Sequence, residues 1–473
     1  MEVPGRGRAD LAGGCGWKRA RADPRGLGAS AEAWNRSTSA GGPLVCWETT
    51  LRAEPAAGGS PASRFAVTDS KPPKQPPTNS AIGDPGMGGP DAGTHAGADS
   101  SGGVFDPKSR LVVAMSGGVD SSAAAWILRE AGHGLVGLFM RNGVKVSAAD
   151  AGKKSCCSVN DARDARMVAA ALEIPFQAVD LGEEFRDVIR YFLDSYRDGK
   201  TPNPCAVCNR DLKFRRLMDF ADEVGAAGVA TGHYARLDRD PSGRVRVRRG
   251  VDRRKDQSYQ LFSVAEADLA RTRLPLGDLE KPAVRELAEQ AGLRTHAKPD
   301  SQEICFVPGN DYRKLLEQHG VPLRPGRIVD TSGAHLADHP GIAGFTIGQR
   351  RGHGLGGSPE PRYVVELDAE SATVVVGSKR ECLFESATLD APNWIGVDPP
   401  ESGELRIAVQ IRYHHGAAPA TLDLTGDRPC VRFDEPQSAV TPGQGAAFYL
   451  GDRLIGGSWI ASAKRVPATA PTG

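Results

Sequence analysis

The sequence lacks a long hydrophobic run, a strong net charge and the cysteine spacing of a small secreted protein. No apolar stretch approaches the roughly 20 residues that a membrane-spanning helix needs. The formal net charge is +1, so bulk charge does not indicate a nucleic-acid-binding protein, and any basic surface must be local. The nine cysteines are scattered and odd in number, which favours a reducing compartment, predicted here as the cytoplasm.

The first part of the chain lacks any sustained hydrophobic periodicity. Residues 1–106 are rich in glycine, alanine, proline, serine and aspartate. Such a segment cannot bury enough apolar surface to offset the entropy lost on ordering, so we expect a disordered tail. Interspersed acidic residues and the absence of an apolar h-region argue against a targeting signal. We expect residues 1–106 to be a dispensable tail or an over-extended start of the reading frame.

An apolar run that breaks at two glycines and restarts as an alanine-rich amphipathic segment predicts a strand, a tight loop and a helix. The loop then lies at a helix N-terminus, where unpaired N–H groups and the helix dipole favour a pyrophosphate. Gly117 and Gly118 allow close approach of the backbone, and Ser116 and Ser121 can donate hydroxyls. Asp120 can hold a magnesium ion that bridges the phosphates.

This loop is neither a Walker A loop nor a dinucleotide-binding loop. No lysine follows the glycines, and the pattern G-x-G-x-x-G is absent. The pattern Ser-Gly-Gly-x-Asp-Ser at 116–121 resembles the pyrophosphate loop of the ATP pyrophosphatases, which cleave ATP between its α and β phosphates and transfer AMP to a substrate oxygen. The alternative is an ordinary serine-glycine turn.

Strand and helix patterns alternate over residues 107–311, which predicts a parallel sheet covered on both faces, with ligands at the carboxyl ends of the strands. Residues 312–380 predict a small central α+β domain, and 381–465 predict a C-terminal β-barrel. The expected strands include 135–140, 176–180, 228–231, 404–413 and 430–433, and the expected helices include 160–173, 185–196 and 209–224.

Two cysteines at C-x-x-C spacing stand in a predicted loop that two prolines make rigid. Cys205 and Cys208 fit a redox pair, a catalytic cysteine with an accessory one, or half of a structural zinc site. Zinc would need two more ligands, which the vicinal Cys156 and Cys157 can supply. Cys305 alone is typical of a buried core cysteine, and the sequence does not pair it with Cys208.

Seven motifs together resemble the tRNA-specific 2-thiouridylase family, in the family's order and over roughly residues 110–462. They are the pyrophosphate loop, Gly-Leu-Phe-Met at 137–140, Thr-Pro-Asn-Pro at 201–204 with Cys208, Ala-Thr-Gly-His-Tyr at 230–234, Lys-Asp-Gln-Ser-Tyr at 255–259, Lys-Pro-Asp-Ser-Gln at 298–302 with Cys305, and Arg-Tyr-His at 412–414. The resemblance implies the adenine-nucleotide-hydrolase-like (PP-loop) fold for the first domain and a tRNA-binding barrel.

The resemblance also implies the reaction. The family replaces the C2 oxygen of the wobble uridine in tRNA by sulfur and uses ATP to turn that oxygen into part of AMP, a good leaving group. Cys305 would carry a persulfide, and Cys208 would resolve it through a disulfide. The implied partners are the anticodon arm of tRNA and a sulfur-donor or sulfur-relay protein.

Binding roles are implied at positions that match the family. ATP contacts are implied for Ala114, Met115, Ser116, Gly117, Gly118, Val119, Asp120, Ser121, Met140 and Gly232, with Met140 against the adenine. Contacts with tRNA are implied for Asn203, Pro204, Cys205, His233, Lys255, Asp256, Gln257, Arg412, Tyr413 and Gln444. The arginines of 244–249 alternate along a predicted strand and are a further candidate basic surface.

The chain departs from the family pattern at Cys205, where many members have aspartate. In those members the aspartate is proposed to act as a base or to orient the uracil, and no residue of this chain is an obvious replacement for it. The change also creates a set of three thiols, Cys205, Cys208 and Cys305, which is suited to an iron–sulfur cluster with one iron open to bind sulfide. The cluster is a hypothesis at this point.

Two rival functions follow from the same residues. Another adenylating enzyme of the superfamily, such as a lysidine synthetase, would need no persulfide cysteine. A non-catalytic nucleotide- or RNA-binding protein would not need an intact loop over 116–122 beside both thiols, so the sequence argues against it.

Overall fold

The computed structural model describes residues 109–143, 159–300, 304–307, 311–355, 360–401 and 403–467. These residues belong to one compact unit, Ala92–Gly473. The predicted tail and the pair Cys156 and Cys157 lie outside the described residues. Within those ranges, none of the helices is both long enough and apolar enough to cross a membrane.

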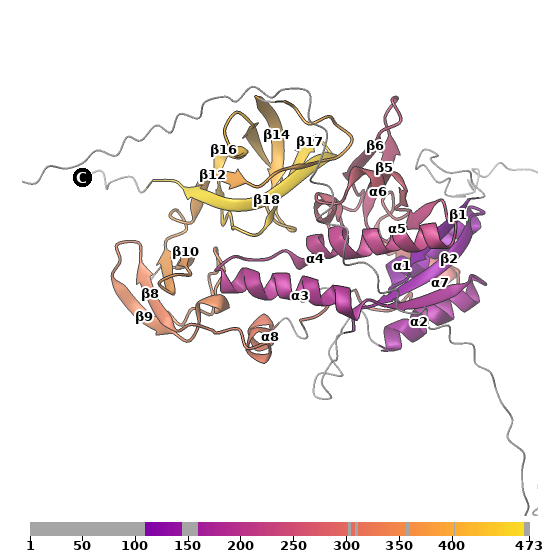
Figure 1. Cartoon of the computed structure of the whole chain (residues 1–473), viewed down its shortest axis with the longest axis horizontal. Coiled ribbons are helices and arrows are strands. Elements are labelled where there is room, and N and C mark those ends of the chain that lie inside the picture. The colour runs from indigo at the N-terminus through magenta and orange to yellow at the C-terminus, as the bar shows by residue number, and fades with distance from the viewer. Residues whose placement is uncertain are drawn as a thin grey trace, which may run out of the picture. The chain divides into compact units, whose positions relative to one another are not determined.

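A five-stranded parallel sheet runs in the order β3-β2-β1-β4-β7 (Figure 1). Its strands are β1 Arg110–Ala114, β2 Gly134–Arg141, β3 Phe176–Asp180, β4 Gly228–Ala230 and β7 Thr272–Arg273. Alternate residues of β1 face opposite sides, so that Leu111 and Val113 join one apolar cluster and Val112 joins another. The predicted α/β domain with a parallel sheet is confirmed.

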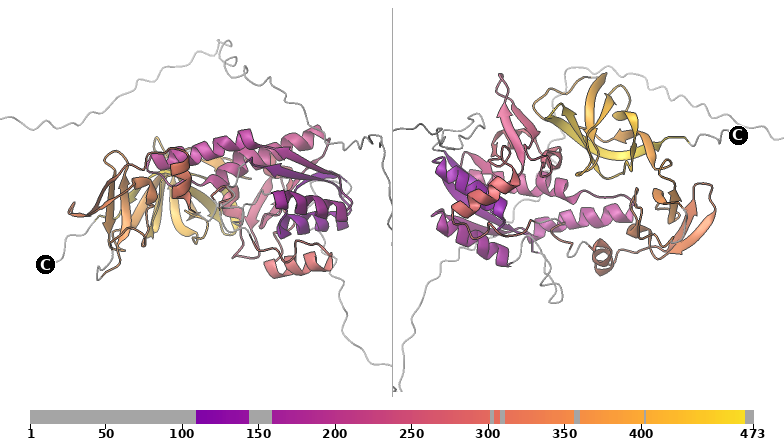
Figure 2. Two further views of the ribbon diagram at one scale, coloured as in Figure 1. Left: turned by 90° about the horizontal axis from the view of Figure 1, so that it is seen from below. Right: turned by 180° about the vertical axis from the view of Figure 1, so that it is seen from behind.

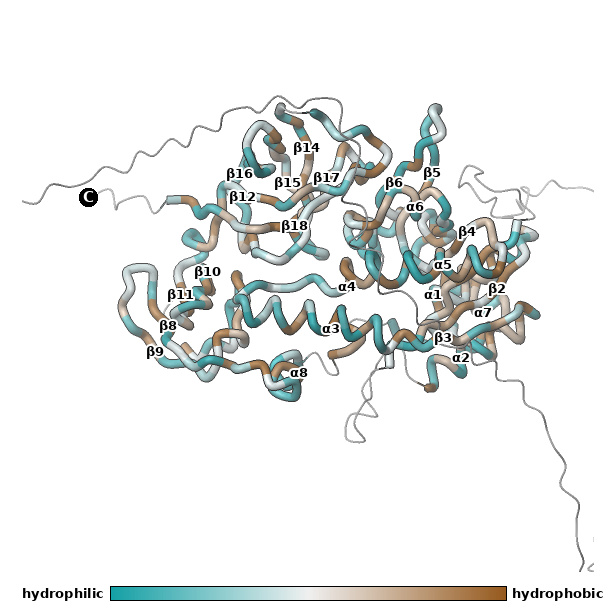
Figure 3. The backbone as a smooth tube through the Cα atoms, in the orientation of Figure 1, coloured by the Kyte–Doolittle hydropathy of each residue, from teal (hydrophilic) through white to brown (hydrophobic). Residues whose placement is uncertain are grey.

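Helices cover both faces of this sheet, as predicted. The helices are α1 Val119–Glu130, α2 Val159–Ala171, α3 Gly182–Arg197, α5 Phe214–Glu223 and α7 Lys281–Gln290. Residues of α1, α2 and α7 share the cluster that contains Leu111 and Val113, and residues of α5 pack on Val112. The tube of α3 alternates between hydrophobic and hydrophilic colours in Figure 3, in keeping with a single buried stripe that includes Phe185 and Phe192.

The central region contains a four-stranded sheet in the order β10-β11-β8-β9, preceded by helix α8. Its elements are α8 Tyr312–Gln318, β8 Gly326–Asp330, β9 His335–His339, β10 Tyr363–Asp368 and β11 Thr373–Gly377. Asp311 caps α8, because its carboxylate accepts from the backbone N–H of Lys314 at 3.3 Å. A small apolar core of its own, which includes Ile328, Val364 and Val374, holds this sheet together.

The last part of the chain forms a closed six-stranded antiparallel barrel, as predicted (Figure 2). Its strands are β12 Leu383–Leu389, β14 Glu404–Gln410, β15 Ala418–Asp423, β16 Cys430–Ser438, β17 Gly445–Leu450 and β18 Arg453–Arg465. The predicted extension of β14 to residue 413 is wrong. The amide of Gln410 donates to the carbonyls of Arg412 and Tyr413 at 3.1 and 2.8 Å, which stabilises a turn there.

A hairpin from the first domain extends the barrel sheet. The hairpin strands β5 Ala235–Arg239 and β6 Val245–Arg249 pair with each other, and β6 pairs with β18 through Arg248 opposite Arg453 and Val247 opposite Leu454. The short strand β13 Asn393–Trp394 also pairs with β18. The first domain and the barrel are therefore joined by backbone hydrogen bonds as well as by side chains.

One aromatic ring fills the space between the first domain and the barrel. Phe262 is fully buried, and its ring lies edge-on to Trp459 at 5.0 Å between centroids. A Cβ atom at Gly445 would lie 2.3 Å from that ring, and one at Gly457 would lie 2.8 Å from the Cβ of Phe262. The barrel strands need glycine at both positions because a larger residue would displace the ring.

We expect Phe262→Ala to lower the free energy of unfolding by about 3–5 kcal/mol, because it empties the centre of this junction. Equilibrium unfolding of the full chain in urea, followed by tryptophan fluorescence, measures the change. Leu450→Ala, at a barrel residue that is 43% exposed, is the matched control and should change stability by no more than about 0.5 kcal/mol. Equal losses in the two variants would contradict the assignment of Phe262 to the junction.

Candidate active site

The loop between β1 and α1 has the geometry of an anion-binding site. Gly117 has φ +71°, and a Cβ atom there would lie 2.2 Å from the carbonyl oxygen of Asp161, so only glycine fits. The hydroxyl of Ser121 accepts from the N–H of Ser116 at 3.1 Å and donates to the carbonyl of Gly118 at 3.2 Å. Because the N-cap residue Gly118 has no side chain, the first turn of α1 can receive an anionic ligand.

Three residues with an implied nucleotide role lie at one edge of the sheet. Ala114 ends β1, Met140 lies near the carboxyl end of β2, and Gly232 follows β4, which are neighbouring parallel strands. A Cβ atom at Gly232 would lie 2.8 Å from the carbonyl carbon of Asp120, so this position also needs glycine. Met140 packs against two apolar clusters, one of which contains Cys208.

The carboxylate of Asp120 is bonded to other side chains of the protein. Its carboxylate accepts from Nζ of Lys281 at 2.7 and 2.8 Å and from the hydroxyl of Tyr234 at 2.7 Å. Burial, followed by the charge of Asp120, raises the pKa of Tyr234 far above its ordinary value, so this hydroxyl remains a donor. A magnesium ion at Asp120 would therefore have to displace Lys281.

Cys205 and Cys208 lie on a helix and not on the predicted loop. Helix α4 Pro204–Val207 continues directly into a π-helical turn over Cys208–Lys213 and then into α5. Asn203 is the N-cap, since its side-chain oxygen accepts from the N–H of Ala206 at 3.2 Å, and Pro204 holds the first helical position. These are ordinary helix-start signals, so the prediction of a rigid loop at these residues is wrong.

The three thiols differ in their exposure. Cys205 is exposed, Cys208 is 8% exposed, and Cys305 is partly buried. Cys208 belongs to an apolar cluster that also contains Phe306, and Cys305 packs against that same cluster. The ring of Phe306 meets the rings of α3 edge-on, with Phe185 at 5.5 Å and Phe192 at 5.1 Å between centroids. The structure thus brings the Cys208 and Cys305 segments to one cluster.

The hypothesis of an iron–sulfur cluster does not fit this arrangement. Among the residues that the structure describes, no group of three or more histidine, cysteine, aspartate or glutamate side chains could hold a metal ion. Cys205, Cys208 and Cys305 are therefore not arranged as a metal-ligand set in the part of the chain that the structure describes.

The barrel holds the segment that leads into the cysteine helix. The side-chain amide of Gln444 donates to the carbonyls of Thr201 and Pro202 at 3.1 and 2.9 Å. The hydroxyl of Tyr259 donates to the carbonyl of Gly445 at 3.1 Å and also accepts from the amide of Asn203 at 3.4 Å. Gln444, expected to contact tRNA, is thus a support for the Thr201–Pro202 backbone in this structure.

The other positions with an implied tRNA contact have different surroundings. Lys255 donates to Asp300 at 2.6 Å. The carboxylate of Asp256 is buried and bonded within its own loop, and Gln257 accepts from the N–H of Tyr234 at 3.0 Å. Asp256 and Gln257 therefore shape the loop that presents Lys255.

His233 and Tyr413 are partly buried aromatic groups, and His233 stacks on the ring of Phe214 at the start of α5. His233 bonds the hydroxyl of Thr231 at 2.7 Å, and burial lowers its pKa to about 3, so the imidazole is neutral. Burial is also the main cause that raises the pKa of Tyr413 to about 12, with Cys205 among the nearby charges. Tyr413 and its neighbour Arg412 follow β14, so the barrel brings them towards Cys205.

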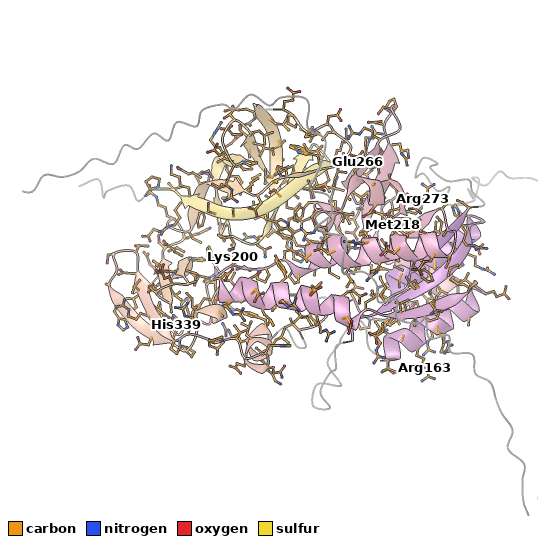
Figure 4. The ribbon with its side chains drawn as sticks, viewed as in Figure 1. Arg163, Lys200, Met218, Glu266, Arg273 and His339 are labelled. Atoms are coloured by element: carbon orange, nitrogen blue, oxygen red, sulfur yellow. The ribbon has the colours of Figure 1, made fainter. Side chains whose placement is uncertain are left out.

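The arginines of 244–249 are paired with acidic side chains. Arg244 bonds Glu266 at 2.9 Å and Asp398 at 2.7 Å, and Glu266 is labelled in Figure 4. Arg246 and Arg248 both pair with Asp238. The predicted basic surface is therefore largely neutralised, which weakens it as a candidate for binding phosphates.

Lys281 and Asp300 are charged residues at the loop that were not among the predicted site residues. Lys281 contacts both Asp120 and Asp300, although 161 positions separate Lys281 from Asp120 in the sequence. No local pattern marks such a contact, so only the fold reveals it.

Models of known protein families match almost all of residues 109–460. Three family models match, described as the tRNA methyl transferase HUP domain at residues 109–309, the tRNA methyl transferase PRC-barrel domain at 313–378 and the aminomethyltransferase beta-barrel domain at 384–460. A solved 4-thiouridine synthetase–RNA complex with bound ATP is 20% identical, with a TM-score of 0.28 over 44% of this chain and 50% of that chain.

Similar full-length relatives are tRNA-specific 2-thiouridylases. The MnmA protein of Geobacter metallireducens is 47% identical over 362 residues, which cover 75% of this chain and 98% of the relative. The MnmA protein of Solibacter usitatus is 45% identical over 370 residues, which cover 75% of this chain and 100% of the relative. With its parallel-sheet domain, central domain and closed barrel, this chain belongs to the MnmA family of tRNA-specific 2-thiouridylases, which are tRNA sulfurtransferases.

Proposed function

We propose that the protein replaces the C2 oxygen of the wobble uridine in tRNA with sulfur, by adenylation followed by transfer from a cysteine persulfide. The observation that carries this proposal is the packing of Cys208 and Cys305 on one apolar cluster. Met140 belongs to the same surroundings and lies at the sheet edge where the pyrophosphate loop begins. Thiol chemistry and nucleotide chemistry can therefore act on one substrate atom.

The first step activates the oxygen. The loop over 115–118 and the N-terminus of α1 bind the phosphates of ATP, and the C2 oxygen of the uridine attacks the α-phosphorus, so that pyrophosphate leaves. A urea-like carbonyl oxygen is a poor leaving group, and AMP is a good one. A magnesium ion would neutralise the phosphates, and Asp120 would hold it after releasing Lys281.

The second step delivers sulfur. The terminal sulfur of a persulfide on Cys305 attacks C2, and AMP leaves with the former carbonyl oxygen. The thiolate of Cys208 then attacks the Sγ of Cys305, which breaks the sulfur–sulfur bond and leaves the new sulfur on the nucleobase. The product is a Cys208–Cys305 disulfide, which a cellular dithiol must reduce before the next turnover.

Binding of tRNA is proposed for surfaces around the exposed Cys205. Lys255, Arg412 and Tyr413 offer cationic and aromatic groups of the kind that grip an unstacked loop base. Cys205 lies near Tyr413, beside the position that the flipped uracil would occupy. We further propose a cytoplasmic setting, a sulfur-donor protein as partner, and a division into domains over 107–311, 312–380 and 381–465.

We expect Cys305→Ser and Cys208→Ser each to lower 2-thiouridine formation by roughly 10³-fold or more, because each removes a sulfur nucleophile that no other group replaces. The assay incubates the full chain with tRNA, Mg-ATP and a sulfur source and measures nucleosides by mass spectrometry. Cys430→Ser, a partly buried barrel thiol, is the control and should keep wild-type activity. Full activity of Cys305→Ser would favour an adenylating enzyme that uses no persulfide.

Gly117→Ala should weaken ATP binding by about tenfold or more, because the added methyl group collides with the Asp161 carbonyl and shifts the loop. Isothermal titration calorimetry with Mg-ATP gives the dissociation constants. Gly225→Ala is the matched control, since Gly225 also has a positive φ of +64° but has open space around its Cβ position. The same affinity for ATP in Gly117→Ala and Gly225→Ala would contradict the assignment of the loop to the nucleotide site.

A further inference from the structure

One helical turn carries both cysteines of the C-x-x-C pair. Cys205 is the second residue of α4, and Cys208 directly follows the last residue of that helix. The backbone N–H of Cys208 donates to the carbonyls of Cys205 and Pro204. A bond to the third residue before the donor is the 3₁₀ pattern, in which side chains three positions apart lie one above the other. The side chains of Cys205 and Cys208 therefore start from neighbouring points of the same turn.

This spacing is close to the spacing of a disulfide. Side chains three positions apart on a helix have Cβ atoms about 5–6 Å apart. A disulfide joins Cβ atoms about 3.5–4.5 Å apart, so an adjustment of about 1–2 Å closes the pair. The hydrogen-bond pattern changes at Cys208, where the π-helical turn Cys208–Lys213 begins, so the adjustment falls where the helix is already irregular.

The two cysteines differ in their access to solvent. Cys205 is exposed, whereas Cys208 is 8% exposed and belongs to the apolar cluster on which Cys305 also packs. A disulfide between Cys208 and Cys305 would lie against that cluster, which includes the buried ring of Phe306. Thiol–disulfide exchange depends on access to the sulfur that is attacked, so a dithiol carried by another protein would reach this bond slowly.

Cys205 is placed to attack that bond from within the chain. It lies in the first turn of the helix that starts at Pro204 and continues through α5, where the positive end of the helix dipole stabilises a thiolate. A nucleophile held on the same turn acts at a far higher effective concentration than one that arrives from solution. Because its thiol is also exposed, a disulfide that contains Cys205 is open to a reductant in solution.

We propose that Cys205 regenerates the enzyme after each sulfur transfer. The thiolate of Cys205 attacks the Sγ of Cys208 in the Cys208–Cys305 disulfide, the bond between Cys208 and Cys305 breaks, and Cys305 leaves as a thiolate. The exchange involves no net oxidation, and Cys305 is free to accept the next sulfur. This inference rests on the proposed function, because the Cys208–Cys305 disulfide is the product of that reaction.

A dithiol from solution then completes the cycle. One of its thiolates attacks the exposed Sγ of Cys205, and Cys208 leaves as a thiolate. The second thiol of the reductant breaks the mixed disulfide and releases Cys205, so the reductant becomes a disulfide and two electrons enter the enzyme. The C-x-x-C pair thus moves the oxidised bond from an apolar cluster to the surface.

A single turnover without air tests the exchange. The full chain is loaded with a persulfide on Cys305 by a sulfane-sulfur donor, freed of excess donor and mixed with Mg-ATP and tRNA. The reaction is stopped with acid, free thiols are alkylated with N-ethylmaleimide, and the disulfides are mapped by peptide mass spectrometry. Because the persulfide is the only oxidant present, the wild type should end with a Cys205–Cys208 disulfide and reduced Cys305. In Cys205→Ser the Cys208–Cys305 disulfide should accumulate, and the control Cys430→Ser should give the wild-type pattern.

The rate of reduction gives a second readout. With reduced thioredoxin as the probe, the oxidised wild type should be reduced about tenfold or more faster than oxidised Cys205→Ser, because only the wild type presents an exposed sulfur of the disulfide. Dithiothreitol, a much smaller dithiol, should narrow this difference. Equal rates with thioredoxin would contradict the role of Cys205.

The mapped disulfides separate failure of the exchange from failure of the proposed function. A wild type that forms 2-thiouridine and ends with a Cys208–Cys305 disulfide would overturn the exchange and leave the proposed function standing. A Cys205–Cys305 disulfide, or 2-thiouridine formed without any disulfide, would overturn the exchange together with the proposed role of Cys208. Since the wild type alone gives these results, poor folding of Cys205→Ser would not leave the exchange untested.

Discussion

The packing of two cysteine segments against one apolar cluster is the contact on which the other features depend. Cys208 lies inside the cluster, and Cys305 packs on it beside the buried ring of Phe306. Two rings of α3 meet the ring of Phe306 edge-on, so the residue that follows Cys305 packs on a long helix. An apolar setting slows adventitious reaction of a thiol.

The rest of the fold serves this contact from two sides. On one side, parallel strands end at the pyrophosphate loop, and Gly117 and Gly232 provide the close backbone approaches that the loop needs. On the other side, the barrel supports the start of the cysteine helix through Gln444, while Phe262 and the barrel glycines join the two domains. The barrel therefore supports the helix that carries Cys205 and leads to Cys208.

The periodicity of the sequence was sufficient for the parallel sheet, its helices on both faces and the barrel, because each rests on a local pattern. It was insufficient where distant segments meet. No local sequence pattern predicts the pairing of β6 with β18 or the bond from Lys281 to Asp120. The same holds for the neutralisation of Arg244 by Glu266 and Asp398. Helix α4, which begins at Pro204 after the N-cap Asn203, did carry local start signals, but its flanking prolines suggested a loop instead.

Oxidative cross-linking of the two thiols tests the central claim most directly. The full chain with Cys205→Ser is treated with diamide in the absence of tRNA, and its disulfides are mapped by peptide mass spectrometry. The account predicts an intramolecular Cys208–Cys305 disulfide as the main product, with Cys382 and Cys430 remaining reduced. Cross-links that join either cysteine only to another molecule, or no link between the two under conditions that oxidise exposed thiols, would contradict it.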